Sequence, residues 1–261
     1  MLPTVDFCGI PMTRLLIGAN PFGGYSHQNG ERDREMREYH TQERILETWD
    51  RAWKAGINTF VTNNETPHVV NTTRTYLAAG GPMKWIAQVN GRNIPDIIQA
   101  LAGVVEMGAV AAYFHGALVD DFYARKDEAT LREWVKIARG HNLRIGVAAH
   151  NPDSHRWVDS LGLVDFHAVP FFNCGSVHSR DGGERFVIED MSESVRLIRS
   201  LAKPCIAYKV LGAGRINARM GLDYAYRNIK PGDVVNLGMY RGDKDDMVEE
   251  NVRLVGEILS E

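Results

Sequence analysis

The side chains best suited to proton transfer in this sequence follow short apolar runs. Four of the nine histidines come directly after such runs, namely His27, His68, His115 and His150. Lys209 stands within the apolar stretch IAYKVLG, and Glu65 follows an earlier run. Imidazole titrates near neutral pH, and partial burial lowers the pKa of an amine toward useful basicity. Lys209, His115 and Glu65 are therefore the candidate catalytic residues, as bases, as electrophiles toward an oxyanion or, for Lys209, as a Schiff-base former.

The same histidines are candidate metal ligands. Neutral imidazole and carboxylate suit a divalent zinc, iron, manganese or nickel ion. The tentative ligand set is His115 and His150 with help from His27, His68 or Glu65. The sequence has no H-x-H or H-E-x-x-H spacing, so the signal comes from composition alone. The alternative interpretation, that each histidine is a hydrogen-bonded rim or surface residue, stays open.

Amide side chains and one arginine follow the same apolar runs. Amides suit a substrate with many hydroxyl groups. The segment LGAGRIN at 211–217 can offer backbone N–H groups and a guanidinium to a phosphate or carboxylate, or it is a plain tight turn before a helix. It lacks the third glycine of a dinucleotide-binding fingerprint. The candidate substrate-binding residues are Asn20, Asn63, Asn64, Gln88, Asn90, Asn173 and Arg215.

Eight apolar runs, each followed by an amphipathic helix pattern, must position these residues. Runs of this kind are typical of parallel strands covered by helices. Their alternation predicts a single (β/α)₈ barrel, which gathers its chemistry at the carboxyl ends of the strands and needs about 250 residues. With 261 residues, the chain is expected to form one domain over 1–261. The predicted strands are Leu15–Ala19, Thr59–Thr62, Trp85–Val89, Ala109–Phe114, Arg144–Ala149, Asp165–Pro170, Cys205–Val210 and Asp233–Leu237.

Composition indicates an ordinary globular protein. The chain has 30 Lys and Arg against 33 Asp and Glu, a net charge of -3 that gives no reason to expect a nucleic-acid partner. No apolar stretch approaches the roughly 20 residues of a membrane span, and the first residues lack a basic region before an apolar one, so we expect a cytoplasmic protein. Cys8, Cys174 and Cys205 are far apart and predict buried thiols. The oligomeric state stays open.

Several segments resemble aldo-keto reductases. The first, GIPMTRLLIGANPFGG at 9–24, is similar to the amino-terminal hairpin and first strand of that family. Four more segments follow in the family's order and span nearly the whole chain: AGINTFVT at 55–62, AAYFHG at 111–116, KPCIAYKVLGAGRI at 203–216 and GMYRGDKDDMVEENVRLV at 238–255. The resemblance implies an aldo-keto-reductase-like barrel.

The resemblance does not extend to the catalytic tetrad of that family. Its members hold an Asp and a Tyr after the second strand, a Lys on the third and a His on the fourth. Here the Asp position is Val61, and the stretch at 63–67 contains no Tyr. The Lys position falls near Gln88 or Val89, and only His115 matches. Valine cannot tune the pKa of a proton donor, so the family's hydride-transfer mechanism is not expected.

We therefore expect a barrel enzyme without hydride-transfer groups. The nicotinamide-contacting positions of the family are Ala148–Ala149 and Val169 here, whose side chains cannot hydrogen-bond an amide, so NADPH is not favoured. The expected substrate is a small polyhydroxylated or carbonyl-bearing, sugar-like molecule, and the reaction is proton transfer or metal-assisted chemistry of a lyase, epimerase, isomerase or hydrolase. Two alternatives remain, an NADPH-dependent reductase with relocated catalytic groups and a catalytically inert binding subunit.

Overall fold

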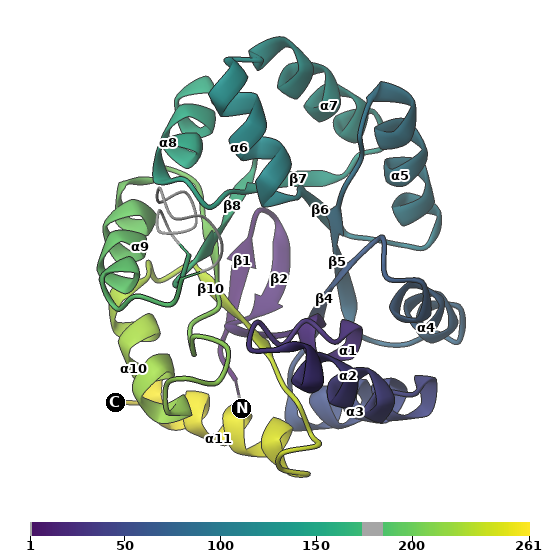
Figure 1. The fold of residues 1–261 in the computed structure, drawn as a ribbon, viewed down its shortest axis with the longest axis vertical. Helices are drawn as coiled ribbons and strands as arrows, with labels where there is room; N and C mark the ends of the chain where they lie inside the picture. Colours follow the sequence, from purple (N-terminus) through teal and green to yellow (C-terminus); the bar gives the residue numbers. More distant parts are fainter. Residues whose placement is uncertain (1, 174–184) are drawn as a thin grey trace.

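A closed barrel of eight parallel strands forms the centre of the molecule (Figure 1). The computed structural model describes residues 2–173 and 185–261, so Cys174 lies outside the described residues. The strand order around the barrel is β10-β3-β4-β5-β6-β7-β8-β9. The predicted fold class is confirmed. The barrel strands are β3 (Leu15–Gly18), β4 (Thr59–Asn63), β5 (Lys84–Val89), β6 (Ala111–Phe114), β7 (Arg144–Ala148), β8 (Phe166–Pro170), β9 (Cys205–Tyr208) and β10 (Val234–Gly238).

Helices surround the barrel, as amphipathic stripes between the strands require. Several begin with common capping residues: Asn93, Asp127 and Asn217 each accept a backbone N–H at the start of a helix. The helices are α1 (Asn20–Gly23), α2 (Gly30–Tyr39), α3 (Gln42–Ala55), α4 (Pro67–Ala78), α5 (Ile94–Glu106), α6 (Gly116–Arg125), α7 (Glu128–Gly140), α8 (Pro152–Leu161), α9 (Glu189–Ser200), α10 (Ala218–Asn228) and α11 (Met247–Ile258).

An antiparallel hairpin of β1 (Thr4–Phe7) and β2 (Ile10–Thr13) covers the amino-terminal end of the barrel. Its Phe7 and Met12 are fully buried, and the Phe7 ring lies 5.3 Å from that of Phe166. These side chains belong to the apolar cluster inside the barrel, while a second cluster lies between the strands and the helices. The hairpin therefore fills the end of the barrel away from the expected chemistry.

All eight predicted strands are present, with ends that differ by at most two residues. The difference that matters most is at β9, which ends at Tyr208. Lys209 was predicted to lie on the strand, but it follows the strand with a left-handed φ of 56°. A left-handed φ takes the backbone out of the extended region that a strand occupies, so the ladder ends here. Lys209 therefore lies on the loop at the mouth.

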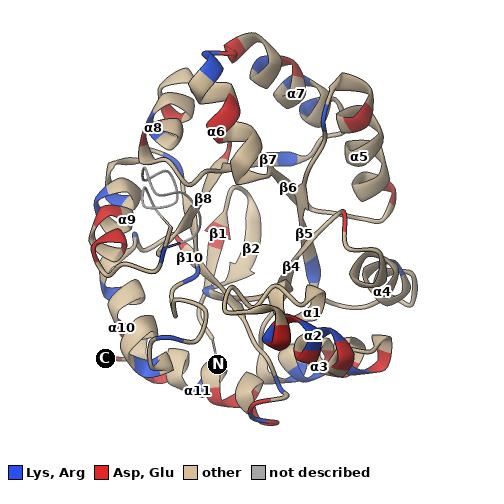
Figure 2. Ribbon diagram, viewed as in Figure 1, with Lys and Arg blue, Asp and Glu red and all other residues tan. Residues whose placement is uncertain are grey.

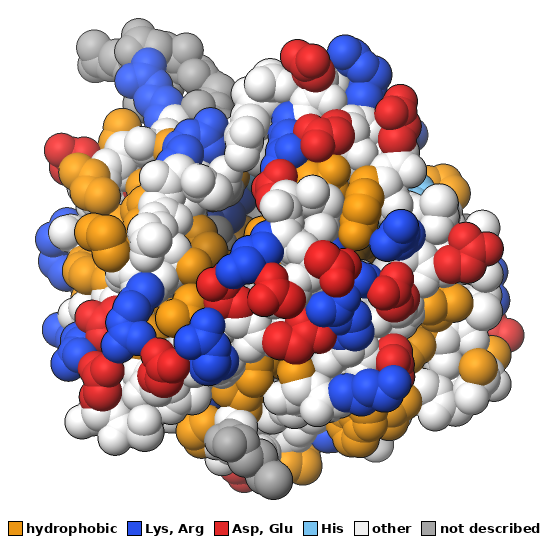
Figure 3. Space-filling model, turned by 90° about the horizontal axis from the view of Figure 1, so that it is seen from below, with side chains coloured by type: hydrophobic (Ala, Val, Ile, Leu, Met, Phe, Trp, Pro, Cys, Tyr) orange, Lys and Arg blue, Asp and Glu red, His pale blue; other side chains and the backbone are white. Residues whose placement is uncertain are grey.

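Charged side chains lie mainly on the outer helices (Figure 2). On the face seen in Figure 3, basic and acidic side chains alternate. Between α3 and α11 together with the segment that leads into it, Arg51 donates to Asp245 and Glu249, and Arg241 donates to Glu47 and Asp245. Among the described residues, no helix is long and apolar enough to cross a membrane.

Candidate functional site

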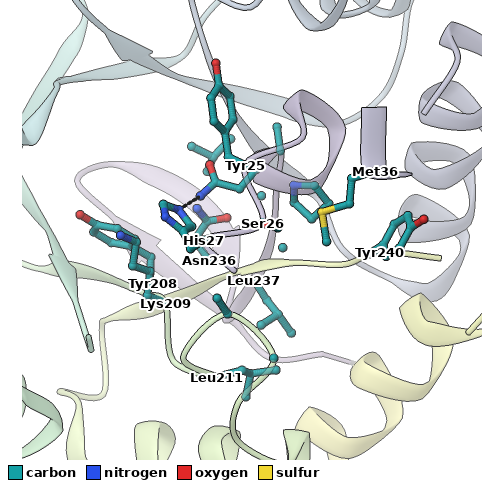
Figure 4. Close-up of a pocket in the computed structure, with 18 of the residues that line it drawn as sticks. Tyr25, Ser26, His27, Met36, Tyr208, Lys209, Leu211, Asn236, Leu237 and Tyr240 are labelled. Atoms are coloured by element: carbon teal, nitrogen blue, oxygen red, sulfur yellow. Dashed lines mark hydrogen bonds between the residues drawn. The ribbon is translucent and has the colours of Figure 1, made fainter. Parts of the chain in front are cut away.

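A pocket of about 250 Å³ opens at the carboxyl ends of the strands. It lies between the ends of β3, β4, β5, β9 and β10 and the segment at 25–36. In Figure 4, Tyr208 and Lys209 face the pocket from one wall, and Met36 and Tyr240 face it from the other. Five of the predicted site residues line it: Asn20, His27, Asn63, Gln88 and Lys209. Rim position in the sequence thus identified part of the pocket.

The family's Asp position lies in the wall of this pocket, and it is Val61. Gln88, near the family's Lys position, lines the pocket on the neighbouring strand, where Asn63 pairs with Gln88 in register. Neither side chain can supply a charge to a proton donor.

Tyr113, which was not among the predicted site residues, also lines the pocket. Its hydroxyl donates a hydrogen bond to Gln88 Oε1 at 3.2 Å. Burial raises the pKa of Tyr113, which makes the phenol a poor proton donor. The tyrosine was missed because it lies inside an apolar strand, AAYF, where an aromatic ring usually belongs to the core.

Asn236 on β10 carries an amide oxygen toward the same pocket. Its Oδ1 is buried, and no described residue donates a hydrogen bond to it. Gly18 faces this amide, because a Cβ at position 18 would lie 2.9 Å from Asn236 Oδ1. Buried polar atoms are nearly always paired, so a ligand hydroxyl or amine is a fitting donor here.

The loops after β3 and β9 are tied together beside the pocket. Arg215 donates to the backbone oxygens of His27 and Gly212, both at 2.9 Å, and its guanidinium lies 3.9 Å from the centre of the Phe186 ring. Gln28 donates to the Ala213 oxygen at 2.9 Å. Arg215 was predicted to bind substrate, but the structure places its guanidinium on backbone carbonyls outside the pocket lining.

The predicted amides after β4 and β5 hold the two loops to each other. Asn63 Oδ1 accepts from the backbone N–H groups of Glu65 and Thr66, and Asn64 Oδ1 accepts from that of Asn90. Asn90 Nδ2 donates to Glu65 Oε1 at 2.9 Å. Asn64, Glu65 and Asn90 line a second, polar pocket of about 300 Å³. These amides therefore hold the loops after β4 and β5 in place, and Asn90 orients the Glu65 carboxylate.

His115 caps the helix that follows β6. Its Nδ1 accepts the backbone N–H of Ala117 at 3.3 Å, so the neutral ring carries its proton on Nε2. Burial is the main cause that lowers the pKa of His115, and the charges of His150 and Lys209 lower it further. The negative charges of Glu65 and Asp120 raise it, but the net shift is downward. Glu65 and Lys209 therefore both act electrostatically on His115.

His150 is held by Asp120, a residue that the sequence analysis missed. Asp120 Oδ2 lies 3.1 Å from His150 Nδ1 and accepts the backbone N–H of His150 at 3.0 Å. Asp120 lies within α6, not after a strand, so an analysis of strand ends could not find it. In the sequence it is marked only as an acidic residue in the helix that follows His115.

The tentative metal set is not assembled in the described part of the chain. No group of three His, Cys, Asp or Glu side chains there is placed to hold a metal ion. His68 Nε2 donates to the Phe22 oxygen at 2.7 Å, and His27 Nε2 lies 3.1 Å from Asn20 Nδ2. The predicted substrate ligand Asn173 is buried and accepts the backbone N–H of Arg185. It does not line the main pocket.

Comparison with known proteins places the fold. No family model matches the sequence, and no curated protein matches it. A protein of Pseudomonas aeruginosa described as an aldo-keto reductase superposes with a TM-score of 0.68 at 14% identity, covering 98% of this chain and 94% of its own. The 3-hexulose-6-phosphate synthase of Salmonella typhimurium gives 0.60 at 14%, covering 95% and 99%.

A third solved structure is the orotidine 5'-monophosphate decarboxylase of Methanocaldococcus jannaschii. It superposes with a TM-score of 0.57 at 14% identity, covering 96% of this chain and all of its own. Identities this low speak to architecture and leave the reaction open. The resemblance to aldo-keto reductases found in the sequence is confirmed at the level of fold, and this chain is a (β/α)₈ barrel similar to theirs.

Proposed function

We propose that this protein is a barrel enzyme that moves protons on a small carbonyl-bearing, polyhydroxylated substrate, as an isomerase, epimerase or lyase. The observation that carries the proposal is the pocket at the carboxyl ends of the strands, with the Lys209 amine in its wall among several amide side chains. Chemistry gathers at this face of the barrel in this fold. By the sequence resemblance, Val61 in the same wall takes the position of the aspartate of aldo-keto reductases.

The roles follow from the geometry. His115 presents Nε2–H, because Nδ1 is engaged by the backbone of Ala117. A neutral imidazole whose pKa is lowered by burial donates a hydrogen bond to a carbonyl oxygen without giving up its proton. Lys209, in the pocket wall, and Glu65, oriented by Asn90, serve as acid and base groups.

The pocket wall supports a hydroxylated substrate. Amides of Asn20, Asn63, Gln88 and Asn236 line it. The buried Asn236 oxygen has no donor among the described residues. Amides donate and accept at once, which matches a hydroxyl group that does the same.

The test is exchange of carbon-bound hydrogen in D₂O. Purified protein is incubated with three- to six-carbon aldoses and ketoses and their phosphates, and deuterium at the carbon next to the carbonyl is followed by NMR. The wild type should exchange at least one sugar. Lys209→Met and His115→Ala should slow exchange about 100-fold or more. Lys136→Met and His141→Ala, on exposed residues of the outer surface, should match the wild type. Full exchange by Lys209→Met and His115→Ala would remove these two roles.

A second candidate function is an NADPH-dependent reductase with relocated groups. Tyr113 and Lys209, a phenol and an amine, line one pocket and favour it. The raised pKa of Tyr113 and its hydrogen bond to Gln88 argue against the phenol as proton donor. A fluorescence titration decides: micromolar binding of NADPH with reduction of a carbonyl supports the reductase, and absence of binding removes it. Metal content with and without chelator tests the metal-assisted version.

A further inference from the structure

Two carboxylate contacts fix the ring of His150 at the mouth of the barrel. Asp120 Oδ2 lies 3.1 Å from His150 Nδ1 and accepts the backbone N–H of the same residue at 3.0 Å. We propose that His150 is a second proton-transfer residue of this site and that Asp120 is its positioning residue. The inference rests on the proposed function, since it names a further residue for that reaction.

Asp120 is built to stay ionised. Its side chain is 7% exposed, and its Oδ1 accepts the backbone N–H of Asn151 at 3.1 Å and the Ser154 hydroxyl at 2.8 Å. Burial alone would raise the pKa of Asp120, but the hydrogen bonds from His150, Asn151 and Ser154 hold it well below its usual range. A carboxylate accepts and does not donate, so His150 carries a proton on Nδ1.

His150 and His115 are therefore set in opposite tautomers. In neutral His150, the proton is on Nδ1 and Nε2 is the basic nitrogen. In neutral His115, Nδ1 accepts from Ala117, so Nε2 is the donor. The neighbouring strands β6 and β7 end beside each other and present one basic and one donating imidazole to the mouth.

The start of α6 leaves room for the ring of His150. A Cβ at Gly116 would lie 3.0 Å from His150 Cε1, closer than most such contacts. Gly116 directly follows His115, so both imidazoles lie near the start of α6. The charge of His150 lowers the pKa of His115, which agrees with this closeness.

This pair supports removal of a proton next to a carbonyl. His150 Nε2 takes the proton from carbon, and the electron pair of the C–H bond forms a carbon–carbon double bond. The carbonyl pair moves to oxygen, where His115 Nε2–H stabilises the negative charge. The imidazolium formed at His150 is stabilised by Asp120, as in other carboxylate–histidine pairs. Return of the proton from His150 to a different carbon or to the other face completes an isomerisation.

The first test measures the tautomers and needs no substrate. In ¹⁵N-labelled full-length protein, histidine side-chain NMR should show His150 protonated on Nδ1 and His115 on Nε2. Asp120→Asn should change the His150 pattern, because an amide can donate to Nδ1. Ser154→Ala, which removes another contact of Asp120, should leave it unchanged. A wild-type His150 protonated on Nε2 alone would overturn the inference.

The second test separates this inference from the proposed function. Dihydroxyacetone, glyceraldehyde and their phosphates serve as probes of exchange in D₂O. His150→Gln and Asp120→Asn should slow exchange about 100-fold, while His141→Gln on the exposed surface should not. If the wild type exchanges and His150→Gln matches it, the inference fails and the function stands. If the wild type exchanges no probe, the function fails, and the inference that depends on it is withdrawn.

Discussion

Two pairs of histidines lie on the same side of this barrel in very different surroundings. The rim pair, His115 and His150, is partly exposed at the ends of β6 and β7. The wall pair, His155 and His167, is fully buried between α8 and β8, with Nδ1 of one ring 3.0 Å from Nδ1 of the other. The two pairs consist of the same side chains, but they differ in burial and in the groups that contact their ring nitrogens.

The wall pair is shut off from solvent and linked ring to ring. His155 Nε2 donates to the Ala149 oxygen at 3.1 Å, so its Nδ1 accepts from His167 Nδ1. Burial lowers the pKa of His167, which favours the neutral ring. In that ring Nε2 carries no proton, and neither it nor Asp159 Oδ1, 3.4 Å away, has a hydrogen-bond partner among the described residues. Nothing in this pair reaches the mouth.

The rim pair is divided between separate partners. His115 is bound by the backbone of its own helix and His150 by Asp120, so the two rings carry different tautomers. The comparison teaches that a histidine's sequence position relative to a strand end matters less than which groups fix its protons. Four changes test this contrast, from the largest expected effect on stability to the smallest.

His167→Phe should destabilise the protein most, by about 3 kcal/mol. The change leaves His155 Nδ1 without its donor in the buried wall, and the larger phenyl ring must fit the space of the imidazole. Chemical denaturation followed by circular dichroism measures the loss. Deuterium exchange per folded molecule should be unchanged, and a selective loss of exchange would contradict the division into wall and rim.

The second prediction concerns pH. Burial lowers the pKa of His155 to about 3 and that of His40 to about 4, from 6.5. The unfolded chain therefore binds protons first as the pH falls below 6.5, and folding free energy is lost from there toward the folded pKa. Lowering the pH from 6.5 to about 5 should cost roughly 1.5 kcal/mol per histidine. His155→Gln should flatten this dependence, and an identical slope in the variant would refute the assignment.

His150→Ala should cost only about 1 kcal/mol. The side chain is 20% exposed, and the carboxylate of Asp120 keeps three other donors. Its melting temperature should thus stay close to that of the wild type, in contrast to His167→Phe. A loss equal to that of His167→Phe would mean that the rim pair is structural after all.

Gly116→Ala should change stability least, by about 0.5 kcal/mol or less. Alanine favours a helix start over glycine, which offsets crowding of its Cβ, 3.0 Å from His150 Cε1. The ring of His150 should shift, so exchange should fall about 10-fold while the melting temperature holds. Gly140→Ala, at the end of α7 with open space around its Cβ, is the matched control. Equal exchange by the two variants would argue against a fixed His150.

The sequence was sufficient for the architecture. Apolar runs located all eight strands, because strands that are covered on both faces consist mostly of apolar residues. Rim position also predicted that Lys209 and Gln88 line the pocket. Spacing along one chain could do this because each strand end points to the same face.

The sequence could not predict which side chains contact one another at the site. Asp120 lies within a helix and Tyr113 within an apolar strand, so neither stands where rim residues are expected. Arg215 follows a strand as predicted, yet its guanidinium binds the backbone oxygens of His27 and Gly212. Hydrogen-bond partners often lie on loops that are far apart in the sequence. The local sequence pattern therefore cannot predict them.

The tie between the loops after β3 and β9 has a consequence for synthesis on the ribosome. Gln28 contacts Ala213 and Arg215 contacts His27, at sequence separations of 185 and 188 residues, and β10 closes the barrel against β3. Contacts of such high sequence separation form late. While β10 is still inside the ribosome, the pocket is incomplete. A ligand can therefore stabilise the barrel only after β10 has paired with β3.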